Sequence, residues 1–79
     1  MRFSRHARER MTERGVSLEQ VESLIRTVPP FRYFHGGIWK TGYYDPGSEL
    51  FVGQLGDTIT TIMAHVKPQY IESLRRRAP

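Results

Sequence analysis

Residues 17–34 read S-L-E-Q-V-E-S-L-I-R-T-V-P-P-F-R-Y-F, and this stretch decides the fold because its apolar period changes midway. Ser17 and Gln20 have the spacing of a capping box, which marks the start of a helix. Apolar residues then recur at helical spacing as far as position 28. Pro29-Pro30 ends the helix, since proline has no backbone N–H to donate. From Phe31 the apolar residues alternate with a period of two, which is typical of a strand.

Another helix precedes this one. Ser4 can cap its start, and the helix runs through Met11 to Arg14, where Gly15 can supply the left-handed residue that ends it. The sequence therefore begins with two helices that are separated by a short turn.

Strand-like segments and a closing helix follow the two prolines. Strands are expected over residues 31–34, 38–44, 50–55 and 58–66, because these segments are rich in aromatic and β-branched side chains with turn residues between them. Pro68 can open a helix over 68–74. We predict an α+β fold with two N-terminal helices, three or four antiparallel strands and a C-terminal helix, with all helices on one face of the sheet.

Length and composition limit what the protein can be. Its 79 residues suffice for a single domain spanning 1–79, and it has no cysteine for disulfides or a thiolate zinc site. No signal peptide is recognisable ahead of the first helix, and no apolar stretch approaches the roughly 20 residues that span a bilayer. We expect a cytoplasmic protein that does not engage membranes.

The charge of the chain indicates a polyanionic partner. Lys and Arg number 12 against 8 Asp and Glu, the sequence pI is about 10.0, and all but Lys40 and Lys67 of the basic residues are arginine. Arginine binds phosphate oxygens in pairs and stacks on bases, so nucleic acid is favoured over membrane. The alternative is that a net charge of +4 only keeps a small protein soluble.

The first helix places basic residues beside its apolar side. At about 100° per residue, His6, Arg10 and Arg14 fall on the same arc as Ala7 and Met11, the only apolar residues of this helix. We expect them to line a cleft where the helix meets the sheet. The structural alternative is that the arginine stems lie along apolar surface and that His6 makes only a local hydrogen bond.

These residue types suit phosphodiester chemistry. Histidine can take or give a proton near neutral pH, and arginine can neutralise charge that builds on a phosphate. In RNA the 2′-hydroxyl can act as the nucleophile, so neither a metal nor another cofactor is required. The three histidines are far apart in sequence and do not form a metal-binding motif.

The later strands offer weaker candidates. Both faces of the segment 58–65 mix apolar and polar residues, so alternation does not tell which face is buried. Tyr43, Tyr44, Trp39 and Tyr33 could stack on bases, although most of these rings are expected in the core.

Several motifs resemble a known group of proteins. Residues 3–11 (FSRHARERM) and 13–17 (ERGVS) resemble the opening of a small bacterial family of unassigned function, close to polymorphic-toxin domains, with a His-Ala-x-x-Arg-Met-x-x-Arg-Gly-like pattern. Residues 43–46 (YYDP), 50–52 (LFV) and 56–61 (GDTITT) resemble the second half of the same domains. Such domains are similar to the ribonuclease toxins of the barnase, EndoU, colicin and RelE superfamily.

The resemblance implies a barnase- or RelE-like fold and a metal-independent RNA endonuclease that often attacks tRNA and is restrained by an antitoxin or immunity protein. It places the catalytic histidine at His6, the arginine one turn later at Arg10, and the hydroxyl residue of the late strand at Thr61, with Thr60 one residue away. No delivery region precedes Met1, unlike in secreted toxins, so we expect a free-standing intracellular protein.

The sequence therefore favours a ribonuclease over two rivals. His6, Arg10 and Thr61 are the predicted catalytic residues, and the predicted RNA-binding residues are Arg5, Arg8, Arg14, Tyr43, Thr60, Arg75, Arg76 and Arg77. One rival is a non-catalytic nucleic-acid-binding module. The other is a protein-interaction module whose sheet edge accepts an antitoxin strand or a second copy of the chain as a homodimer.

Overall fold

The capping residues begin and end the N-terminal helices where the sequence predicts. In the computed structural model, which describes residues 1–77, the Ser4 hydroxyl accepts a hydrogen bond from the Ala7 amide at 3.1 Å, and Gly15 ends that helix at φ 65°. The Ser17 hydroxyl accepts from the Gln20 amide at 3.1 Å, while the Gln20 side chain accepts from the Ser17 amide at 2.7 Å. These caps bound α1 (Arg5–Arg14) and α2 (Leu18–Thr27).

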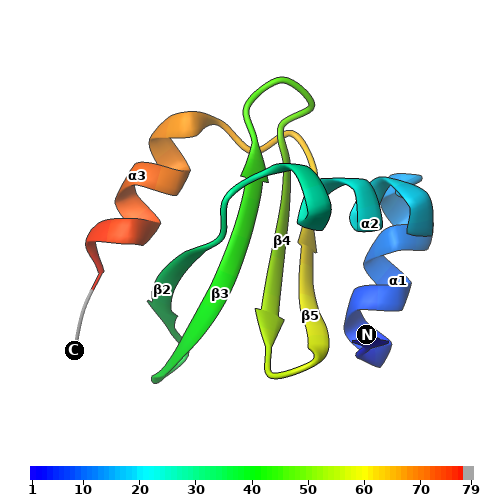
Figure 1. Ribbon diagram of the computed structural model, residues 1–79, viewed down its shortest axis with the longest axis horizontal. Helices are drawn as coiled ribbons and strands as arrows, with labels where there is room; N and C mark the ends of the chain where they lie inside the picture. The colour runs from blue at the N-terminus through cyan, green and yellow to red at the C-terminus, as the bar shows by residue number, and fades with distance from the viewer. Residues whose placement is uncertain (78–79) are drawn as a thin grey trace.

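The sheet has five strands in the order β1-β5-β4-β3-β2, whereas the sequence predicted three or four. Strands β2 to β5 lie side by side in Figure 1. The additional strand is β1 (Arg2–Phe3), which pairs parallel to β5, so the sheet is mixed and not purely antiparallel. The Ser4 amide extends this pairing with a hydrogen bond to the Ile59 carbonyl at 2.9 Å. The other elements are β2 (Phe31–His35), β3 (Ile38–Asp45), β4 (Leu50–Leu55), β5 (Thr58–Met63) and α3 (Pro68–Arg76).

The helices cover both faces of the sheet, which corrects the expectation that they share one face. Val52 of β4 is fully buried with Val21 and Leu24 of α2, whereas its neighbour Phe51 is buried against Leu74 of α3. Adjacent residues of a strand point to opposite faces, so α1 and α2 lie on one face and α3 on the other. The apolar run Leu50-Phe51-Val52 at the start of β4 is the sequence signal of a strand that is covered on both sides.

The last strand is shorter than expected. Strand β5 ends at Met63 rather than at position 66, because the chain turns at His65, which adopts a left-handed φ of 59°. Val66 then packs in the core beneath α3, and its carbonyl accepts a hydrogen bond from the Tyr44 hydroxyl at 2.7 Å. Pro68 opens α3 in the first helical turn, as predicted.

A β-bulge in β5 settles which of its residues face inward. Gly53 pairs with Thr61, but Gln54 pairs with Ile59, so Thr60 is an extra residue in the ladder. The bulge reverses the alternation, and Ile59 and Ile62 therefore both join the core beneath α1 and α2. No helix among residues 1–77 is long and apolar enough to cross a membrane.

Candidate functional site

Helix α1 forms one wall of a groove along β5. Ala7 is fully buried against the sheet and Met11 is half-buried, which fixes the rotation of the helix about its axis. That rotation brings His6, Arg10 and Arg14 to the edge of the apolar contact. A groove of about 510 Å³, called the basic groove below, runs from these residues across the sheet; it is lined by His6, Arg10, Arg14, His35, Lys40, Thr60, Thr61, Ile62, Met63 and Ala64.

The bulged part of β5 contributes two threonines to the lining of the basic groove. The Thr60 Oγ1 atom is itself buried and has no hydrogen-bond partner among residues 1–77. Such atoms are rare in folded proteins. Thr61 lies on the sheet face opposite to α1 and α2, because it pairs with Gly53 and not with the apolar positions of the other face.

A buried tyrosine lies next to Thr61. Tyr33 is 2% exposed, and burial raises the pKa of its phenol, while a hydrogen bond with the Thr61 side chain opposes that rise. A side chain at Gly53 would clash with the Tyr33 hydroxyl, so the glycine leaves the space that the phenol occupies. Tyr33, Gly53 and Thr61 thus fix one another across β2, β4 and β5.

The second wall of the basic groove comes from the β2–β3 hairpin and was not predicted. Tyr33 pairs with Lys40 and His35 pairs with Ile38, so His35 and Lys40 lie on the same face of the hairpin as Tyr33. A two-residue turn at Gly36-Gly37 sets this register and was visible in the sequence. A two-residue turn at this position pairs Tyr33 with Lys40, so the sequence contains the signal that places Lys40 on this wall.

The basic groove is suited to anions. Two arginines, one lysine and two histidines line it, and its lining, within the part of the chain described, contains neither aspartate nor glutamate. Arg10 also contacts Glu13 at 2.9 Å on the outer surface of α1, where its side chain is 41% exposed. Ion pairs at this exposure are weak, so Arg10 can exchange Glu13 for a phosphate group.

The other predicted RNA-binding residues lie outside the basic groove. Tyr43 pairs with Val52 and is half-buried against the core of the opposite sheet face, so it does not line the basic groove. On α1, Arg5 contacts Glu9 at 3.3 Å and Arg8 is exposed. At the end of α3, Arg75 lies 4.9 Å over the Phe31 ring, and Arg76 and Arg77 are exposed.

Metal ligands do not gather anywhere in the described chain. Residues 1–77 contain no group of three histidine or acidic side chains that could hold a metal ion. The arrangement in the basic groove instead combines proton carriers, fixed cations and hydroxyls. Those groups can bind a phosphate and transfer protons beside it.

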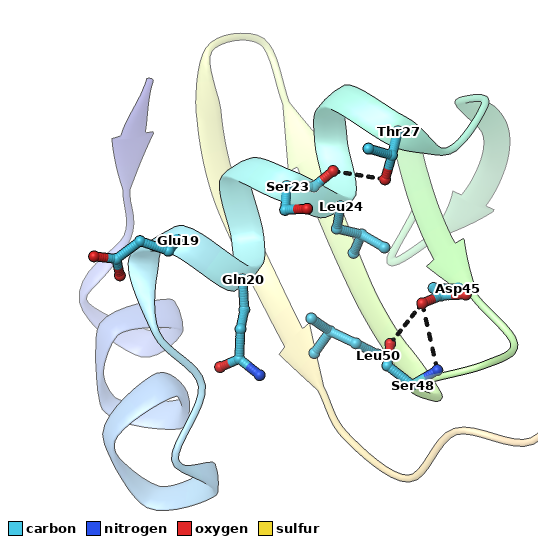
Figure 2. A pocket seen from close by; sticks show the side chains of 8 residues that line it. All are labelled: Glu19, Gln20, Ser23, Leu24, Thr27, Asp45, Ser48 and Leu50. Atoms are coloured by element: carbon cyan, nitrogen blue, oxygen red, sulfur yellow. Dashed lines mark hydrogen bonds between the residues drawn. The ribbon is translucent and has the colours of Figure 1, made fainter.

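A smaller hollow of about 330 Å³ lies between α2 and the β3–β4 turn (Figure 2). Its polar groups serve the local backbone: the Thr27 hydroxyl donates to the Ser23 carbonyl at 2.7 Å, and the Ser48 hydroxyl donates to the Asp45 carboxylate at 3.0 Å. Hydrogen bonds from the Gly47 amide and the Ser48 hydroxyl lower the pKa of Asp45. This hollow has no basic lining residue, so the chemistry is concentrated in the basic groove.

Comparison with known proteins identifies a family. No curated protein and no solved structure matches the chain. Residues 3–73, which run from β1 into α3 and include both walls of the basic groove, match the family described as a domain of unknown function, DUF4258. The match covers most of the 79 residues, and the chain therefore belongs to the DUF4258 family.

Proposed function

We propose that the basic groove binds RNA and cleaves its phosphodiester backbone without a metal. The observation that carries the proposal is the convergence of His6, Arg10, His35, Lys40 and Thr61 on one groove that has no carboxylate in its lining. His6 provides a group that can accept a proton and return it. Arg10, one helical turn away on α1, offsets the charge that develops on the phosphate.

The proposed reaction is an internal transfer followed by product release. His6 removes the proton of the 2′-hydroxyl, and the 2′-oxygen attacks the adjacent phosphorus. The bond from phosphorus to the 5′-oxygen breaks, and that oxygen takes the proton from the imidazolium of His6. The products are a 2′,3′-cyclic phosphate and a 5′-hydroxyl, so every atom of the substrate is retained and no external nucleophile is consumed.

Each remaining residue has a distinct part in this proposal. Arg10 and Lys40 neutralise the non-bridging phosphate oxygens, and Thr61 orients the phosphate by a hydrogen bond. Arg14 extends the positive groove along α1. The arginines outside the groove, on α1 and at the end of α3, attract RNA from a distance. We place this activity in the cytoplasm, with cellular RNA such as tRNA as substrate and an antitoxin-like protein as a partner, as the resemblance to ribonuclease toxins implies.

The test is RNA cleavage in the presence of EDTA. Total RNA is incubated with the wild-type protein, with His6→Ala and with Arg10→Ala. Losing a general acid or base lowers the rate by about 10²–10⁴-fold, and losing a charge-stabilising donor lowers it by about 10²–10³-fold. Arg26→Ala is the matched control, because Arg26 is an exposed arginine of α2 that lies outside the groove and has no part in the proposal.

The outcomes separate the proposal from its main rival. Cleavage that survives both His6→Ala and Arg10→Ala would rule out this mechanism. A wild-type protein that binds RNA in a salt-sensitive manner without cutting it, with binding retained in His6→Ala, would be a nucleic-acid-binding module. A basic groove without acidic residues would serve either function.

A further inference from the structure

The β2–β3 hairpin carries an exposed aromatic cluster on the side away from the basic groove. Arg32, Phe34 and Trp39, called the hairpin platform below, share this face, since Arg32 and Phe34 alternate with the buried Tyr33 and Trp39 pairs with Phe34. The Phe34 and Trp39 rings meet edge to face at 5.4 Å, and the Arg32 guanidinium lies 5.6 Å over the Trp39 ring. Trp39 remains 42% exposed.

The fold gives no packing reason for these rings. Helix α2 covers the far end of β3, where Tyr43 packs, and α3 covers the opposite face of β2. Burying a large aromatic ring is strongly favourable, so one left nearly half-exposed beside a guanidinium is more typical of a binding surface than of a core. The cluster is absent from both hydrophobic cores.

The hairpin platform and one wall of the basic groove lie on the two faces of the same hairpin, at the edge of the sheet. Strand β2 is the outermost strand, and His35 and Lys40 of the same hairpin line the groove. From β5 to β2 is three strand spacings, about 14 Å, so a chain crossing the groove from Thr61 reaches this edge after a short distance. Residues 28–44 contain no aspartate or glutamate, so positive charge continues from one face of the hairpin to the other.

We propose that the hairpin platform binds an unpaired nucleotide of the RNA whose backbone occupies the basic groove. The base stacks on the Trp39 ring or the Arg32 guanidinium, and both types of surface bind bases in single strands. A base within a duplex has both faces covered by its neighbours, so the platform selects single-stranded RNA. The inference rests on the proposed function only in taking RNA as the ligand of the groove.

Aromatic and cationic groups together favour a nucleotide over a protein partner. A nucleotide offers a planar ring for Trp39 and a phosphate for Arg32 within one unit. An acidic protein segment would satisfy Arg32 but would leave the Phe34–Trp39 pair exposed. An apolar segment would cover the rings but would bury the Arg32 charge, which is costly without a partner.

The experiment uses Trp39 as its own reporter, because it is the only tryptophan of the chain. Wild-type protein is titrated with a short single-stranded RNA that carries 2′-O-methyl groups at every position, so that it binds without being cut. The same sequence annealed to its complement is titrated in parallel. We expect saturable quenching of Trp39 fluorescence by the single strand and little quenching by the duplex.

Variants then measure the contribution of the stacked base. Trp39→Ala is expected to weaken binding of the single strand about 5- to 150-fold by anisotropy of a labelled RNA, and Trp39→Phe much less, since it keeps a ring. Leu18→Ala is the matched control, because Leu18 is similarly exposed at 46% but lies at the start of α2. Circular dichroism confirms that each variant is folded.

Two results would overturn the inference: equal quenching by single strand and duplex, or unchanged affinity of folded Trp39→Ala for the single strand. Neither result bears on cleavage, which is measured separately on unmodified RNA. Conversely, an inactive wild-type protein whose Trp39 is quenched by single-stranded RNA would contradict the ribonuclease proposal and still support the platform.

Discussion

Replacing Gly53 with alanine tests the packing at the base of the basic groove. The backbone of Gly53 is not in the left-handed region, so alanine meets no conformational penalty there. Its Cβ would clash with the Tyr33 hydroxyl and would lie 3.0 Å from the Thr61 Cβ. The substitution therefore isolates one effect, the forced displacement of the tyrosine from the threonine.

The size of the effect follows from two opposing contributions. Overpacking in a well-packed interior costs about 1–3 kcal/mol. Restricting the unfolded chain by a glycine-to-alanine change returns about 0.4–1 kcal/mol. The free energy of unfolding should fall by about 1.5 kcal/mol, which lowers the Tm of a domain of this size by about 6–12 °C.

Thermal denaturation followed by circular dichroism measures this change against a matched control. Gly47→Ala adds the same methyl group where the nearest atom, the Asp45 Oδ1, is 3.4 Å away, so only the restriction of the unfolded chain acts, and its Tm should be equal to or slightly above that of the wild type. In a Tyr33→Phe background the clashing hydroxyl is gone, and Gly53→Ala should lose more than half of its effect. Equal Tm values for the two alanine variants, or an equal penalty in both backgrounds, would refute the packing described here.

Three further predictions test the caps, the groove and the buried phenol. Ser17→Ala removes a capping box and should lower stability by about 1 kcal/mol, seen as a lower urea midpoint with an unchanged m-value. Arg14→Ala should weaken RNA binding and reduce the slope of log K against log salt by about 0.7, measured by anisotropy across a salt series. The pKa values of Tyr33 and Tyr44 are raised in the folded state, mainly by burial, so these phenols lose their protons at a lower pH in the unfolded chain than in the folded protein. Stability should therefore fall as pH rises above about 10, and less steeply in Tyr33→Phe, by urea denaturation at each pH.

The helix boundaries could be predicted because their signals are local. Ser17 and Gln20 satisfy each other within one turn, and Gly15 and Pro68 act through their own backbones. Strand β1 was missed for the opposite reason. A segment of two residues is too short to show an alternation of apolar and polar side chains. Arg2–Phe3 forms a strand only because it pairs with β5, more than fifty positions away in the chain.

The residues of the candidate site also fall into those that local spacing predicts and those that only strand pairing brings together. His6, Arg10 and Arg14 were found together because a helix places residues three to four apart on one side, whatever it packs against. His35 and Lys40 join them only through the hairpin register and the order of the strands. The bulge at Thr60 also depends on pairing with β4, so alternation alone could not tell which residues of β5 are buried. The position of Tyr43 against the core beneath α2 likewise follows from its pairing with Val52.

If groups of the basic groove make the 2′-hydroxyl of RNA attack its own phosphodiester, the chemical ends of the cleaved RNA will record that reaction. A defined RNA and the same RNA with one 2′-O-methyl group at the cleaved position are incubated with wild-type protein in EDTA, and the products are identified by mass spectrometry. We expect a 2′,3′-cyclic phosphate and a 5′-hydroxyl from the unmodified RNA, and no cut at the methylated position. A cut at the methylated position, or products that end in a 3′-hydroxyl, would contradict this mechanism.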